Sequence, residues 1–137
     1  MAALTSMAPT AAARSCSLAR VAGKYGFTSS GAIIAPPIGA FTAVGHVTFS
    51  EAGALSGAQT TSIAGNFFDE TFSGTFNMNP DCTGTATANV YHGATLARTT
   101  NLNLNWDDNE KEARAIFLTA GSAITINAKK MFREEED

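Results

Sequence analysis

Histidine and tyrosine, whose side chains can donate and accept protons, are rare in this sequence. The chain of 137 residues contains two histidines and two tyrosines. His46 stands in the alternating segment FTAVGHVTFS, on the face opposite to Phe41 and Phe49. If that face points to solvent, His46 is an ordinary surface residue. If it points inward, the imidazole can donate to or accept from a ligand carbonyl group.

Each of the two tyrosines combines an apolar ring with a hydroxyl group. Tyr25 lies in GKYGF, and Tyr91 lies in NVYH beside His92, which we expect at the surface near a strand end. Buried tyrosines usually pack their rings and direct the hydroxyl group to a polar partner. The alternative is a hydrogen bond to a ligand. We name Tyr25, His46 and Tyr91 as the candidate catalytic residues.

The segment TLARTTNLNLNW supplies candidates for binding. Alternation gives it two faces. One face carries Leu96, Arg98, Thr100, Leu102, Leu104 and Trp106, and the other carries Asn101, Asn103 and Asn105. If the leucine face is internal, the asparagines form an outward polar row; with the opposite parity they line a cavity. The candidate substrate-binding residues are Phe41, Phe76, Asn103 and Trp106.

Asp69 and Glu70 form an acidic pair at the start of a predicted strand. Two carboxylates at the edge of a hairpin are explained by solvation. A carboxylate in the mouth of a cavity, with its pKa raised by apolar neighbours, can instead polarise a substrate.

Motifs for cofactor chemistry are absent from the sequence. It contains no GxSxG, GxGxxG, P-loop or HExxH pattern. The two histidines and two cysteines are too scattered for a structural zinc site. We therefore expect no cofactor and no metal.

Composition and charge narrow the classes of partner. Charged residues make up 15% of the chain and the net charge is −3, with no basic stripe, which argues against nucleic acid. No apolar stretch approaches the roughly 20 residues of a membrane-spanning helix. Composition and charge therefore predict neither a nucleic-acid partner nor a membrane-spanning helix.

The order of strands and turns predicts one domain of the all-β class. From residue 23 onward the hydrophobic period is two, and turn residues recur about every 8–12 positions. About eight short strands joined by short loops favour a single antiparallel up-and-down barrel, which has no exposed edges. Glycines within strands suit the sharp bends that closure needs. We expect a disordered leader at 1–15, the barrel at 16–132 and a solvated acidic tail at 133–137.

Four blocks of the sequence carry a resemblance to known proteins. They are CSLARVAGKYGF, AVGHVTFSEAGALSG, FSGTFNMNPDCTGTATANV and WDDNEKEARAIFLTAGSAITINAKK. Together they resemble a family of small β-barrels, common in bacterial genomes and often exported, whose function is uncharacterised. That family is similar in turn, and more distantly, to the allene oxide cyclase-like barrels, which include plant allene oxide cyclase and the bacterial spirotetronate cyclases. The resemblance covers roughly residues 16–132.

In members of the family a cysteine before the GxYGF strand accompanies the one in NPDCTGT, and Cys16 and Cys82 occupy these places. The resemblance therefore implies a disulfide between the leader and a hairpin tip. The alternatives are two unlinked thiols in a reducing compartment and a reactive catalytic thiol.

The cyclase-like barrels imply a cofactor-independent cyclase or isomerase that closes a ring by holding a hydrophobic substrate in a reactive conformation. The alternatives are a carrier of an apolar ligand, as in lipocalin-like barrels, and an exported barrel filled with side chains. An enzyme of this kind is expected in the cytoplasm, and a disulfide-linked protein is expected to be exported. Apolar residues on the outer strand faces make a homodimer the expected assembly.

Overall fold

The computed structural model describes residues 15–107 and 109–132, so most of the predicted leader and the whole acidic tail lie outside the described residues. A single helical turn, α2 (Leu18–Val21), precedes eight strands. The strands are β1 (Gly23–Ile33), β2 (Gly39–Phe49), β3 (Ala54–Ile63), β4 (Asn66–Phe76), β5 (Thr83–His92), β6 (Thr95–Asp107), β7 (Glu112–Phe117) and β8 (Ser122–Phe132).

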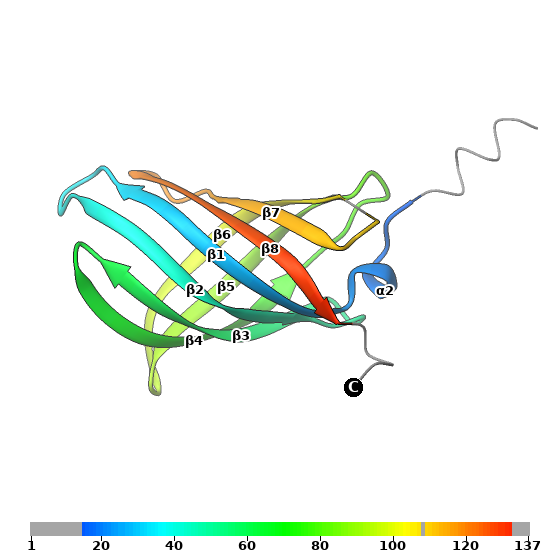
Figure 1. Ribbon diagram of the computed structural model, residues 1–137, viewed down its shortest axis with the longest axis horizontal. Coiled ribbons are helices and arrows are strands. Elements are labelled where there is room, and N and C mark those ends of the chain that lie inside the picture. Colours follow the sequence, from blue (N-terminus) through cyan, green and yellow to red (C-terminus); the bar gives the residue numbers. More distant parts are fainter. Residues whose placement is uncertain (1–14, 108, 133–137) are drawn as a thin grey trace, which may run out of the picture.

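Each strand pairs in antiparallel fashion with the next, and β8 pairs with β1, so the sheet closes on itself (Figure 1). The predicted eight-stranded up-and-down barrel is confirmed. Among the described residues, no helix is long and apolar enough to cross a membrane.

Strand glycines allow the neighbouring strands to approach closely where the sheet curves. A methyl group at Gly45 would collide with the carbonyl oxygen of Ala58 on β3, and one at Gly74 with that of Thr87 on β5. The prediction that strand glycines serve the bends of a small barrel agrees with this geometry.

The barrel has two different ends. The capped end carries α2 and the loops at 50–53, 77–82 and 109–111, to the right in Figure 1. The uncapped end carries the loops at 34–38, 64–65, 93–94 and 118–121, to the left in Figure 1.

Alternate residues of the strands fill the lumen. At the capped end, the ring of Phe49 packs edge-on against the rings of Tyr25, Phe76 and Trp106, with centroids 4.8–5.3 Å apart. Such aromatic pairs contribute roughly 0.5–1.5 kcal/mol each beyond their buried area. Together with Val21 of α2, these rings form a solid floor.

Candidate ligand-binding site

Above the aromatic floor, the middle of the lumen contains a cavity of about 100 Å³. Its wall is almost entirely apolar and combines aromatic rings with small residues. The wall includes Phe27, Phe72, Ala86, Ala88, Leu102, Leu104, Ala113 and Ala128. This cavity is smaller than the roughly 150 Å³ engineered cavity that accepts benzene, and far below the roughly 300–1,000 Å³ of pockets for drug-sized ligands.

Glu70 of β4 organises a polar layer between the cavity and the uncapped end. Its side chain is fully buried and accepts five hydrogen bonds from four residues. Arg98 donates twice, at 2.8 and 2.9 Å, and His92 Nε2 lies 2.7 Å away. Gln59 and Thr61 of β3 each donate to Oε1 at 2.8 Å.

Burial alone would raise the pKa of Glu70, but the hydrogen bonds from Arg98, His92, Thr61 and Gln59 outweigh it and lower the pKa to about 2. Glu70 is therefore a carboxylate at neutral pH. It has no proton to give to a substrate, contrary to the raised pKa that one interpretation of the acidic pair required. Asp69, the other member of the pair, accepts from Thr60 on the exposed outer face.

Apolar side chains fill the other half of this layer. Phe41, Ala43 and Ile124 form a small buried cluster on β2 and β8. Phe41 packs edge-on against Phe117 of β7, with ring centroids 5.6 Å apart. The cavity therefore lies between an aromatic floor and a roof that is half polar and half apolar.

Tyr25 belongs to the floor. Its hydroxyl group accepts a hydrogen bond from Trp106 Nε1 at 3.1 Å. The same hydroxyl group is placed to donate to the backbone carbonyl oxygens of Val21, at 2.7 Å, and Glu110, at 3.0 Å. Burial raises the pKa of Tyr25 to about 12, the Trp106 bond lowers it in part, and the Glu110 charge raises it. The hydroxyl group thus holds the capped end together.

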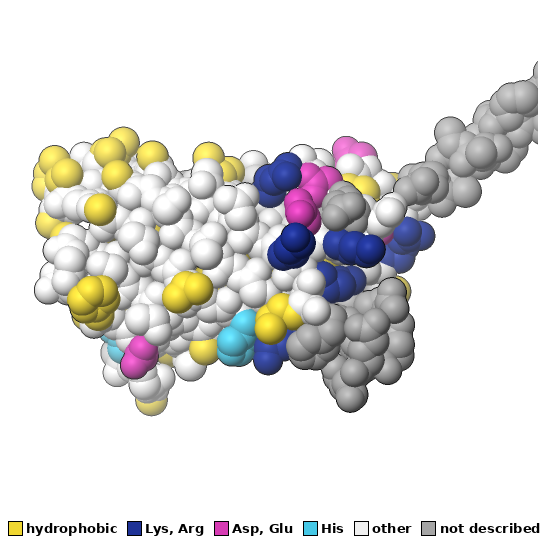
Figure 2. All heavy atoms as spheres, viewed as in Figure 1, with side chains coloured by type: hydrophobic (Ala, Val, Ile, Leu, Met, Phe, Trp, Pro, Cys, Tyr) yellow, Lys and Arg dark blue, Asp and Glu magenta, His cyan; other side chains and the backbone are white. Residues whose placement is uncertain are grey.

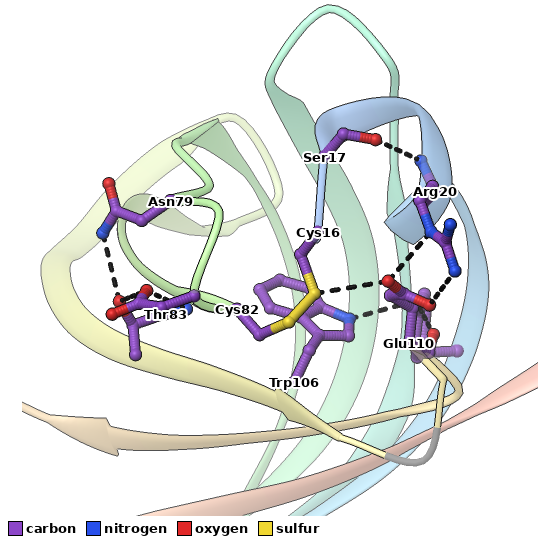
Figure 3. Close-up of a disulfide and its surroundings, with 10 residues drawn as sticks. Cys16, Ser17, Arg20, Asn79, Cys82, Thr83, Trp106 and Glu110 are labelled. Carbon is purple, nitrogen blue, oxygen red and sulfur yellow. Dashed lines mark hydrogen bonds and ion pairs between the residues drawn. A yellow bond between two sulfur atoms is a disulfide. The ribbon is translucent and has the colours of Figure 1, made fainter. Parts of the chain in front are cut away.

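Cys16 and Cys82 form a disulfide at the capped end (Figure 3), so the pairing implied by the resemblance is confirmed. Sγ of Cys16 lies 3.3 Å from Oε2 of Glu110, whose carboxylate is held by Arg20 at 2.9 and 3.2 Å. The two sulfurs and this carboxylate lie close enough to be metal ligands. However, the sulfurs are bonded to each other and the carboxylate pairs with Arg20, so we assign them a structural role.

The candidate residues named from sequence do not come together in one site. Tyr25, Phe76 and Trp106 point into the lumen at the floor, and Phe41 points inward at the roof, but none of them lines the cavity.

His46 and Asn103 are exposed on the outer wall, as the outward alternatives predicted. Tyr91 pairs with the exposed Thr71, so it also faces outward. The lumen roles predicted for His46, Asn103 and Tyr91 are therefore corrected: strand parity turns these side chains away from the cavity.

Sequence reasoning missed Arg98 and Gln59 as lumen residues that line the cavity. A signal for Arg98 was present, since a lone arginine on a mainly apolar strand face indicates a buried partner. The prediction that Leu96 shares the face of Arg98 is wrong. A register shift after Val90 pairs Arg98 with Val90 and Leu96 with Tyr91, so Leu96 lies outside.

No protein-family model matches this chain, and no match was found among curated proteins or solved structures. The resemblance to bacterial small barrels and to cyclase-like barrels therefore stays a prediction.

Proposed function

We propose that the barrel binds a small apolar molecule, or the alkyl end of a longer one, in the lumen and carries it unchanged. The observation that carries this proposal is the cavity of about 100 Å³ with a mainly apolar wall, in which the guanidinium group of Arg98 is paired with the Glu70 carboxylate. A cavity with so little polar surface in its wall favours an apolar occupant over water.

The chemistry of the lumen favours carriage over conversion. Glu70, with a pKa of about 2, and Tyr25, with a pKa of about 12, are both poorly matched to acid–base catalysis near neutral pH. The disulfide suits an exported protein, as expected for a carrier of this kind.

Ring closure by a cyclase is the second candidate. It is supported by Arg98, whose side chain lines the cavity and can place positive charge near a developing oxyanion. Because Glu70 and Tyr25 are poorly matched to proton transfer, the acceleration would come mainly from the shape of the cavity.

One experiment separates the two. A metabolite extract is incubated with substoichiometric protein and followed by liquid chromatography with mass detection. A carrier depletes one compound by one equivalent per barrel and releases it intact on denaturation. A cyclase moves a compound to a new retention time at unchanged mass over many turnovers.

Binding itself is tested with benzene and n-hexanol as probes, by the rise in melting temperature that a ligand of the folded state produces. The wild-type protein should gain stability with at least one probe. If neither probe nor any extracted compound binds, the lumen is a filled structural core and the proposal fails.

A further inference from the structure

Large apolar side chains stand exposed on all four hairpins of the uncapped end. Phe67, beside the β3–β4 turn, is 75% exposed, and the others are each more than half exposed. We call this set the apolar rim: Ile34 and Ile38 between β1 and β2, Phe67, Leu96 beside the β5–β6 turn, and Leu118 between β7 and β8. Single exposed apolar residues need no explanation, but a set gathered at one end indicates a binding surface.

Topology arranges the rim as a ring. In a closed barrel with strand order β1 to β8, the hairpins β1–β2, β3–β4, β5–β6 and β7–β8 alternate with the connections of the other end. Their tips are therefore distributed around the mouth of the lumen. Figure 1 shows all four on the left-hand side of the barrel.

Charge is separated along the same axis. The loops 34–38, 64–65, 93–94 and 118–121 contain no Asp, Glu, Lys or Arg, and Thr119 is their one polar side chain. Near the rim, Glu70 and Arg98 form an ion pair inside the barrel. Asp69 also lies near the rim, and its carboxylate faces solvent on the outer wall. On the face that Figure 2 shows, basic side chains and most acidic ones lie toward the capped end, and many apolar side chains lie toward the uncapped end, where an acidic side chain is also seen.

We propose that the apolar rim docks this protein onto the surface of a lipid membrane, with the capped end in water. The separation of charge selects this occupant, because a boundary between water and lipid requires uncharged apolar groups on one side and tolerates charges on the other. Separate hairpin tips can each enter the interfacial layer, which is about 5–10 Å deep for peripheral elements.

A protein partner fits this end less well. Protein interfaces combine an apolar centre with a polar rim and about one hydrogen bond per 100–200 Å². The rim loops offer almost no side-chain donors or acceptors, and their apolar groups surround the mouth instead of forming one central patch. The docking does not depend on the proposed ligand, but it would let an apolar molecule pass between the bilayer and the lumen without crossing water.

The test is sedimentation of the oxidised full chain with vesicles of phosphatidylcholine, and with vesicles of equal parts phosphatidylcholine and phosphatidylglycerol. The wild-type protein should bind both kinds equally, and added salt should not release it, because the rim carries no charge. Phe67→Ser should weaken the partition about tenfold, and the double change Ile38→Ser with Leu118→Ser should weaken it further.

The matched control is the double change Val44→Ser with Ile116→Ser. These side chains are 59% and 47% exposed but lie on the barrel wall, so vesicle binding should be unchanged. Trp106 is the only tryptophan and is buried at the far end, so its emission checks that each variant is folded.

Equal loss in rim and wall variants, or no binding by the wild type, overturns the proposal. So does binding that requires phosphatidylglycerol and disappears in salt, which would assign the contact to the charged end. If the rim variants instead convert a dimer to a monomer in sedimentation without vesicles, the rim contacts a second copy and the membrane proposal is wrong. Binding of benzene and n-hexanol to the rim variants, measured without vesicles, tests the proposed ligand site separately from membrane docking.

Discussion

Glu70 connects four strands through a single buried carboxylate, and this makes it the most consequential charged residue of the lumen. Its partners come from β3, β5 and β6 while it stands on β4. Removing one member of a buried ion pair leaves the other without compensation, which costs several kcal/mol. Glu70→Gln should therefore lower the free energy of unfolding at pH 7 by about 3 kcal/mol, measured by urea denaturation with Trp106 fluorescence.

The same carboxylate predicts a dependence on acid. Its pKa is about 2 in the folded protein against an ordinary value of 4.5, so the unfolded chain takes up the proton first as the pH falls. The stabilisation, about 3 kcal/mol, is present above pH 4.5 and is lost toward pH 2. The difference in free energy of unfolding between the wild-type protein and Glu70→Gln should fall by more than half when the pH is lowered to about 3. Asp69→Asn, on the exposed neighbour, is the control; an equal acid effect in that variant would contradict the assignment.

Tyr25 predicts the opposite behaviour in base. Its pKa of about 12 in the folded protein exceeds the ordinary value of 10.0, so the unfolded chain loses the proton first as the pH rises. The corresponding stabilisation, roughly 2–3 kcal/mol, is complete below pH 10 and disappears toward pH 12. Tyr25→Phe should be less stable at pH 8 but lose less stability between pH 8 and 11, by urea denaturation. Tyr91→Phe, on the outer face, should follow the wild-type protein; if it matches Tyr25→Phe, the buried hydroxyl is not responsible.

For individual residues, the sequence predicted only which side chains of a strand share one face of the sheet. Alternation placed His46 opposite Phe41 and Phe49, and it offered the outward position that the structure has. It did not reveal that Arg98 reaches Glu70, because that contact joins residues 28 apart and depends on which strands become neighbours. Non-local pairing of this kind has no local signal beyond a charge on an apolar face.

At the scale of elements, α2 illustrates a segment that tertiary contacts must hold. Four residues are too few for an independently stable helix. Its support comes from the Cys16–Cys82 disulfide, the Tyr25 hydroxyl at Val21, and the Arg20–Glu110 ion pair. The double change Cys16→Ser with Cys82→Ser should lower stability by up to about 4 kcal/mol, the chain-entropy value for a closed loop of this length.

The measurement is the melting temperature with and without a thiol reductant. The wild-type protein should lose stability on reduction and approach the double variant, which should not respond. Amide hydrogen exchange at residues 18–21 should accelerate in the reduced wild-type protein and in the double variant, while the hydrogen bonds between β2 and β3 stay protected. Unchanged exchange in α2 would show that packing alone holds the helix.

The strands were easier to predict than their exact faces. A period of two and regular turns predicted the eight strands. The register shift in the β5–β6 pairing could not be predicted, because no turn residue marks its position. After Val90 the pairing skips Ala97, and this moves Leu96 from the predicted inner face to the outer one. A one-residue slip reverses every side chain beyond it, so face assignments near strand ends are the least secure.

For the whole molecule, closure of the barrel could be predicted because eight strands in sequential pairing have a simple way to remove both edges. The contents of the lumen could not, because the cavity is what remains after side chains from all eight strands have packed. Its existence depends on several small residues, including Ala86, Ala88 and Ala113, that share the cavity wall with the rings of Phe27 and Phe72.

This dependence gives a prediction that separates a binding protein from a filled structural barrel. Ala88→Leu adds methylene groups directly into the cavity, so it should raise the free energy of unfolding by about 1–2 kcal/mol and abolish binding of benzene and n-hexanol. A core already packed to native density would respond in the opposite way, with a loss of about 1–3 kcal/mol from overpacking. Ala58→Leu, on the outer face of β3, is the matched control and should change neither binding nor stability appreciably. Since the two outcomes differ in sign, urea denaturation of this one variant decides whether the lumen is an empty site that natural selection has left less stable than it could be, or merely the centre of a small core.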